Sequence, residues 1–216
     1  MKVYIANVSQ LNDPSLFDSL YESVNEERQK KVDSYKFQKD KNLSLGAGVL
    51  LNYALSARGI NNPQFFTGDF GKPFIADKNI CFNLSHSGEL AVCAIAKNTV
   101  GCDVEKMDSP PFEVARKVFS HDEQELLSSA SEEERVALFY RLWTAKESFL
   151  KMVGCGLGAS PKDFSISLEN NHQLIHGHQC SFFDYLCDNK YLLTICIDGY
   201  FDNSDVSFEK VDLRGF

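Results

Sequence analysis

The chain has 216 residues, a formal net charge of −8 and 44% hydrophobic residues, enough for a real hydrophobic core in one large domain or two small ones. The negative balance argues against a nucleic-acid partner, because binding a polyanion depends on clustered Lys and Arg. The N-terminus lacks a signal-peptide pattern, and no stretch approaches the apolar length of a membrane span. We therefore expect a cytoplasmic protein that makes no contact with a membrane.

In chain order, the first half of the sequence predicts a strand, then helices, then short strands. Lys2–Val8 has strand character, one or two helices are expected between Pro14 and Tyr35, and a longer helix over Gln38–Arg58 stops at Gly59. The short strands that follow are predicted at residues 65–66, 74–75, 81–84 and 90–96.

The second half repeats this order. After a strand around Asp103, two S-x-x-E capping boxes predict helices that begin at Ser120 and Ser131, and the second helix runs to Gly154. Further strands are predicted at residues 164–168, 180–185, 191–197 and 206–208. The repetition indicates an α+β fold built as a pseudo-twofold pair of similar α+β subdomains, residues 1–100 and 101–216. Asp103 would then lie near their junction, and clefts between domains are common ligand sites.

Two short segments carry most of the chemical information. Asp103 and Glu105 are two residues apart and follow a short apolar segment, so on a strand both side chains project from the same face. Glu147 and Lys151 are one turn apart in a strongly periodic helix and share a face with Trp143. Three carboxylates and a lysine suit a Mg²⁺ ion bound to a phosphate, because Mg²⁺ takes one or two protein carboxylates together with water and substrate oxygens. The pattern predicts phosphoryl transfer.

Each segment also has an ordinary structural interpretation. A D-x-E on a strand is often only a solvated face, and Glu followed by Lys at i+4 is a common surface pair that contributes about 0.3–0.5 kcal/mol. The two segments together favour a site, because charged residues that interrupt so apolar a helix need a partner or a metal.

The sequence resembles the 4′-phosphopantetheinyl transferases, and within them the surfactin-synthetase-activating (Sfp-like) type. The resemblance rests on three motifs in the family's order and spacing, Phe82–Gly88 (FNLSHSG), Gly101–Lys106 (GCDVEK) and Phe139–Lys151 (FYRLWTAKESFLK). It covers nearly the whole chain. It implies the pseudo-twofold α+β fold of that family and transfer of the phosphopantetheine arm of coenzyme A to a serine of a carrier protein, with release of 3′,5′-ADP.

The resemblance also implies roles for individual residues. Asp103, Glu105 and Glu147 would be the Mg²⁺ ligands, with Glu147 and Lys151 as the catalytic pair. Coenzyme A would be contacted by Lys30, Lys72, Ser85, His86 and Lys151. The chain departs from the family pattern at Glu27 and Asn42, where relatives carry basic residues, and Arg28, Lys39 or Lys41 is expected to compensate.

The expected partners are acyl or peptidyl carrier protein domains, and we expect the enzyme to be a monomer. Two alternatives stay open at this point. A metal-dependent phosphoesterase or nuclease would use the same carboxylates, although the acidic balance and the ordered Ser-His-Ser segment count against it. A non-catalytic relative that binds coenzyme A or a carrier is the other, and the presence of all four residues Asp103, Glu105, Glu147 and Lys151 counts against that.

Overall fold

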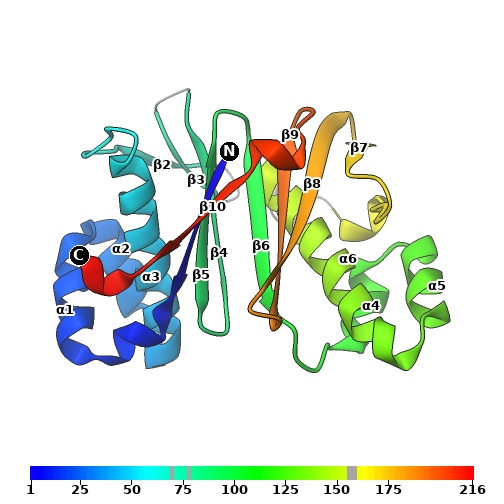
Figure 1. Cartoon of the computed structure of the whole chain (residues 1–216), viewed down its shortest axis with the longest axis horizontal. Coiled ribbons are helices and arrows are strands. Elements are labelled where there is room, and N and C mark those ends of the chain that lie inside the picture. The colour runs from blue at the N-terminus through cyan, green and yellow to red at the C-terminus, as the bar shows by residue number, and fades with distance from the viewer. Residues whose placement is uncertain (69–70, 77–78, 155–159) are drawn as a thin grey trace.

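The structure is a computed structural model that describes residues 1–68, 71–76, 79–154 and 160–216. Two four-stranded sheets stand side by side, with helices α1–α3 on one flank and α4–α6 on the other (Figure 1). The predicted α+β fold is confirmed, because each sheet packs against one long helix. No helix among the described residues is long and apolar enough to cross a membrane.

The first sheet has the strand order β10-β1-β5-β4, and β1 pairs with β10 in parallel and with β5 in antiparallel orientation. On the helical side of this sheet, the side chain of Asp13 caps the N-terminus of α1, and the side chain of Asn25 caps α2 in the same way. The elements of this half are β1 (Lys2–Asn7), α1 (Pro14–Ser23), α2 (Glu26–Asp33), α3 (Gln38–Ser56), β4 (Cys81–Ser87) and β5 (Leu90–Ala96), together with a two-stranded hairpin of β2 (Phe65–Thr67) and β3 (Pro73–Ile75).

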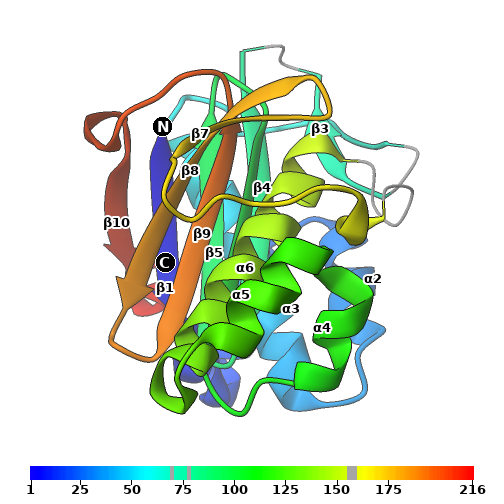
Figure 2. The ribbon, with the colours of Figure 1, turned by 90° about the vertical axis from the view of Figure 1, so that its right-hand side faces the viewer.

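The second sheet has the order β6-β9-β8-β7 and is antiparallel throughout. Both predicted capping boxes are present, Ser120 with Glu123 and Ser131 with Glu134, and the last helix ends at Gly154 in the left-handed conformation. Figure 2 shows the three helices of this half grouped together. Its elements are β6 (Val100–Lys106), α4 (Phe112–Val118), α5 (His121–Ser129), α6 (Glu132–Val153), β7 (His172–Ile175), β8 (His178–Cys187) and β9 (Tyr191–Asp198).

Strand β5 is buried on both faces, and its alternating side chains join two cores. Ala91, Cys93 and Ile95 belong to the core that lies under α3. Val92 and Ala94 belong to a second core shared with β6 and β9 of the other half. This shared core fixes the two sheets relative to each other, because separating them would expose both apolar faces to water.

The structure departs from the predicted elements in a few places. The region between Pro14 and Tyr35, expected as one or two helices, forms two, whereas the segment 164–168, expected as a strand, is not one. Helix α4 and strand β7 were not predicted. The C-terminal strand β10 (Ser207–Val211) pairs with β1, so a cut between residues 100 and 101 does not separate the two sheets.

Gly101 sets how closely α6 approaches β6. A Cβ atom at this position would overlap backbone atoms of Ser148 and Met152 on α6. Strand and helix therefore touch through main-chain atoms at the point where the strand enters the predicted site.

We predict that Gly101→Ala displaces α6 and lowers the free energy of unfolding by about 1–3 kcal/mol, the usual cost of overpacking. Chemical denaturation followed by circular dichroism measures this. Gly215→Ala is the matched control, because a Cβ there meets nothing within 4 Å. Equal stability of the two variants would show that α6 does not depend on the missing side chain.

Candidate active site at the junction of the two sheets

The predicted carboxylates and lysine meet between β6 and α6. Val100, Cys102 and Val104 point into the shared core, so the alternation of the strand turns Asp103 and Glu105 toward the opposite face, where α6 packs. Asp103 is only 3% exposed, whereas Glu105, Glu147 and Lys151 are half-buried. The sequence-based expectation that β6 and α6 would bring these groups together is met in this arrangement.

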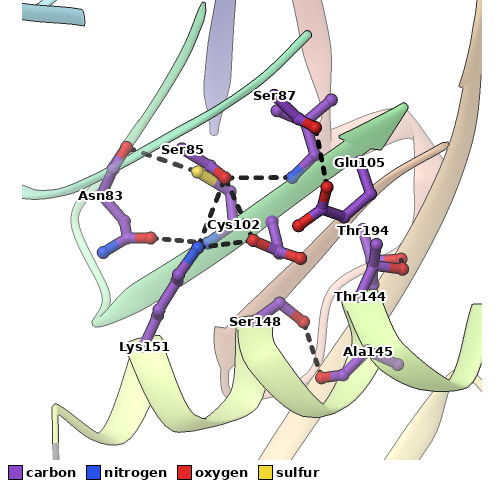
Figure 3. A network of polar contacts seen from close by, with 12 residues as sticks. Asn83, Ser85, Ser87, Cys102, Glu105, Thr144, Ala145, Ser148, Lys151 and Thr194 are labelled. Carbon is purple, nitrogen blue, oxygen red and sulfur yellow. Dashed lines mark hydrogen bonds and ion pairs between the residues drawn. The ribbon is translucent and has the colours of Figure 1, made fainter. Parts of the chain in front are cut away.

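Lys151 forms an ion pair with Asp103. Its Nζ donates to Asp103 Oδ1 and, at 3.3 Å, to Ser85 Oγ (Figure 3). Burial alone would lower the pKa of Lys151, but the charge of Asp103 reverses the effect and raises it, so the ammonium stays charged. Burial raises the pKa of Asp103, and Lys151 opposes that shift.

One oxygen of Asp103 has no partner. Oδ1 accepts hydrogen bonds from Lys151 and from Ser85 Oγ at 3.1 Å, whereas Oδ2 is buried without any hydrogen bond. A buried carboxylate oxygen left in this way is costly unless a cation or a donor occupies the space in front of it. The free Oδ2 therefore fits a metal ligand.

The carboxylates also raise one another's pKa values. Burial, followed by the charge of Asp103, raises the pKa of Glu105 to about 7, and Glu147 adds to the shift. Burial and the charge of Asp103 raise the pKa of Glu147 as well. Three acidic groups share one lysine, so the site has an excess of negative charge that a divalent cation would neutralise.

The three carboxylates are near neighbours and do not form a closed ligand cage. Among the described residues, the one group of three whose ligand atoms lie within 4.8 Å of one another is His121, Asp122 and Glu125. That group is fully exposed on α5, and nothing else at this position indicates a ligand. An ion at the Asp103 site would thus take part of its shell from water or substrate, as Mg²⁺ commonly does.

A small basic pocket lies against α2 and the β2–β3 hairpin. It has a volume of about 110 Å³, and Arg28, Lys31 and Glu27 line it together with Phe65 and Thr67. Partial burial and the charge of Arg28 lower the pKa of Lys31, as expected where two cations share one space. Arg28 uses one donor, Nη1, on the carbonyl oxygen of Ser44 at 3.4 Å.

Helix α2 turns its basic residues in different directions, and contact between Lys30 and coenzyme A stays a prediction. Lys30 points to solvent with 81% of its side chain exposed and lies 4.0 Å from Glu26. Arg28 is one turn before the buried Val32, so the two share the inner face. The i+4 spacing from Arg28 to Val32 was the available signal for Arg28, and Lys31 follows Arg28 at i+3. Of the three residues expected to compensate for Glu27 and Asn42, Arg28 is the one that lines this pocket.

His86 belongs to β4, directly after Ser85. It is exposed on β4, and on a strand it points away from its neighbours Ser85 and Ser87. Partial burial lowers the pKa of His86, and the charges of Lys151, Lys31 and Arg28 lower it further.

Lys72 contacts backbone carbonyl groups of α6 and β6. Its Nζ donates to the carbonyl oxygens of Val100 at 3.2 Å, Lys151 at 2.6 Å and Met152 at 3.0 Å. All three ammonium hydrogens are thus directed to the C-terminal end of α6 and the start of β6, where a cation also complements the helix dipole. Contact between Lys72 and a coenzyme A phosphate stays a prediction.

Comparison with known proteins agrees with this geometry. A family model described as the 4′-phosphopantetheinyl transferase superfamily matches residues 99–196. A 4′-phosphopantetheinyl transferase of Bacillus subtilis is 30% identical over 208 residues, 91% of this chain and 92% of that protein. The chain belongs to the 4′-phosphopantetheinyl transferase family.

Two further transferases show the same relationship. The transferase gsp of Aneurinibacillus migulanus is 33% identical over 76% of this chain and 70% of its own length. The transferase Sfp of Bacillus subtilis strain 168 is 31% identical over 80% of this chain and 81% of its own length. The predicted resemblance to Sfp-like transferases is confirmed, and the protein is an enzyme of this phosphopantetheinyl transferase family.

The raised pKa of Glu105 predicts a pH-dependent stability. Between about pH 4.5 and 7 the folded transferase holds a proton on Glu105 that the unfolded chain has lost, so stability falls as the pH rises through this window. We expect Glu105→Gln to be more stable than wild type by about 1–3 kcal/mol at pH 8 and nearly equal at pH 5. Urea denaturation in EDTA at both pH values measures this.

The exposed Glu113 of α4 offers the matched control, Glu113→Gln. That control should follow the wild type at both pH values. If Glu105→Gln shows the same pH slope as wild type, Glu105 does not titrate in this window.

Proposed function

We propose that the protein catalyses Mg²⁺-dependent transfer of the 4′-phosphopantetheine group of coenzyme A to a serine of an apo acyl or peptidyl carrier domain, with 3′,5′-ADP as the second product. The observation that carries the proposal is the buried Asp103 with an unpartnered Oδ2, next to Lys151 and two further acidic groups of raised pKa. The relatives' names as phosphopantetheinyl transferases supply the class of reaction.

The metal ligands in this proposal are Asp103, Glu105 and Glu147. A bound Mg²⁺ would neutralise charge on the pyrophosphate oxygens of coenzyme A. Asp103 fits this role best, since it is already committed to Lys151 through one oxygen and has the other free.

Glu147 and Lys151 act on the reacting groups. Glu147 takes the proton of the carrier serine, whose oxygen forms a bond to the phosphorus that bears pantetheine. The bond between that phosphorus and the bridging oxygen breaks, and 3′,5′-ADP departs with the negative charge. Lys151, held beside Asp103, stabilises the charge that develops on the phosphate oxygens.

The basic pocket is where we place the nucleotide end of coenzyme A. Arg28 and Lys31 supply positive charge there. The pKa of His86 is lowered, so its imidazole offers a neutral hydrogen-bonding ring and not a further charge. Ser85 lies at the border between the two groups, because its hydroxyl contacts both Asp103 and Lys151. The phosphates of coenzyme A would then extend from the pocket to the carboxylates.

The test of this function is a transfer assay with purified protein, coenzyme A, Mg²⁺ and an apo carrier domain, read by intact-mass spectrometry of the carrier. We predict modification in Mg²⁺ and none in EDTA. Asp103→Ala should lose at least about a hundredfold in rate, since metal-assisted charge neutralisation accounts for several kcal/mol. Coenzyme A should still bind weakly to this variant through the basic residues.

Near-normal turnover of Asp103→Ala at limiting Mg²⁺ would contradict the metal assignment. A wild-type protein that binds coenzyme A and modifies no carrier would favour the non-catalytic alternative, and metal-dependent cleavage of coenzyme A without transfer would favour the phosphoesterase.

The two neighbouring lysines of α2 allow a matched test of the basic pocket. We predict that Lys31→Ala raises the Michaelis constant for coenzyme A about tenfold, because a charged hydrogen bond contributes about 1.5–3 kcal/mol. Lys30→Ala should stay within twofold of wild type, since Lys30 points to solvent. Steady-state kinetics with coenzyme A as the varied substrate measures both, and the reverse order of effects would place the nucleotide elsewhere.

A further inference from the structure

Strands β4 and β6 lie side by side without backbone pairing, and the side chains of β4 bridge the gap. The backbone N–H groups of Cys102, Val104 and Lys106 form the edge of β6 that faces β4. They donate to Asn83 Oδ1 at 2.9 Å, Ser85 Oγ at 3.1 Å and Ser87 Oγ at 3.1 Å, respectively. Every second residue of β4 thus accepts one bond, at a constant offset of 19 residues.

This arrangement fixes the direction of each serine proton. A serine hydroxyl has a single hydrogen to donate. Because Ser87 Oγ accepts the N–H of Lys106, its hydrogen is available for Glu105, whose Oε2 lies 2.7 Å away. Ser85, two residues earlier on β4, makes the same pair of bonds. It accepts the N–H of Val104 and donates to Asp103 Oδ1.

The residues that follow Ser87 in the chain restrict its position. The next residue, Gly88, has φ +61°, and a Cβ there would overlap the hydroxyl group of Tyr191. The same hydroxyl oxygen accepts the backbone N–H of Glu89 at 3.1 Å. The β4–β5 turn is thereby fixed against β9, and the Ser87 hydroxyl has little freedom to leave Glu105.

We propose that Ser87 is a positioning residue that orients the Glu105 carboxylate for a divalent cation, as Ser85 orients Asp103. The inference rests on the proposed function, in which Glu105 is a metal ligand. It assigns to Ser87 a role that the sequence motifs do not give it. The hydroxyl group of Ser87 holds one oxygen of Glu105 and so restricts the orientation of the carboxylate (Figure 3). Hydrogen-bonded partners of ligating carboxylates act in this way in metal sites.

The test measures binding of Mn²⁺, an ion with similar oxygen-ligand preference, to the purified metal-free full chain by the electron paramagnetic resonance signal of free Mn²⁺. Ser87→Ala should weaken Mn²⁺ binding about 10-fold to 100-fold. Ser87→Thr keeps the hydroxyl and should remain within about threefold of wild type. Ser207→Ala, which removes a strand serine of β10, is the control and should bind as wild type.

The inference is overturned if Ser87→Ala binds Mn²⁺ like wild type, or if Ser87→Thr loses as much affinity as Ser87→Ala. Thermal unfolding in EDTA shows that the variants are folded, and rescue by threonine separates a hydroxyl effect from a folding defect. A wild-type protein without saturable Mn²⁺ binding would remove the proposed metal site itself, and with it this role of Ser87. Loss confined to Ser87→Ala supports the inference and leaves the metal site intact.

Discussion

The side-chain bonds from β4 to the open edge of β6 are the constraint on which the rest of the site depends. Buried backbone N–H groups must find acceptors, and the usual solution would be to pair the two strands into one continuous sheet. Here the acceptors are the side chains of Asn83, Ser85 and Ser87. The two sheets therefore stay separate, although the N–H groups along this edge of β6 are hydrogen-bonded. The same hydroxyls are then within reach of the carboxylates of β6. The side chains that join the two halves therefore also position the carboxylates of β6.

Helix α6 is fixed from two further directions, and this determines where Glu147 and Lys151 lie. Lys72 binds the carbonyl groups at its C-terminal end. On the far side, the fully buried Lys146 contacts Glu123 at 2.9 Å and the carbonyl oxygens of Pro161 and Phe164 at 2.7 and 2.6 Å. Breaking such a buried pair by removing one partner is strongly destabilising. Glu147 and Lys151 therefore lie on a helix with little freedom to shift.

The sequence was sufficient for features that follow from local periodicity. The two capping boxes, the common face of Asp103 and Glu105, and the i+4 spacing of Glu147 and Lys151 all depend on residues close in the chain. Sequence-based prediction failed where contacts with residues distant in the chain determine the local structure. Phe164 and Ile166 are both buried and alternate as in a strand, but the N–H of Ile166 is taken by the side chain of Glu123, so no strand partner is needed. The inner face of α2 likewise depends on which side of the helix the core covers, and the local sequence of this highly charged helix does not show it.

The charges at the junction are sorted in space, although the chain as a whole is acidic. Arg28 and Lys31 belong to the first half, whereas Asp103, Glu105 and Glu147 lie on β6 and α6. Lys151 is at the border, since it pairs with Asp103 and its charge also lowers the pKa of His86. A ligand with several phosphates and a divalent cation would match this order, its anionic end against the basic groups and its cation against the carboxylates. Long-range attraction is not needed for that match, because at physiological salt charges separated by more than about 8 Å are largely screened. The local order of charge, and not the net charge of −8, therefore determines which ligand the junction can accept.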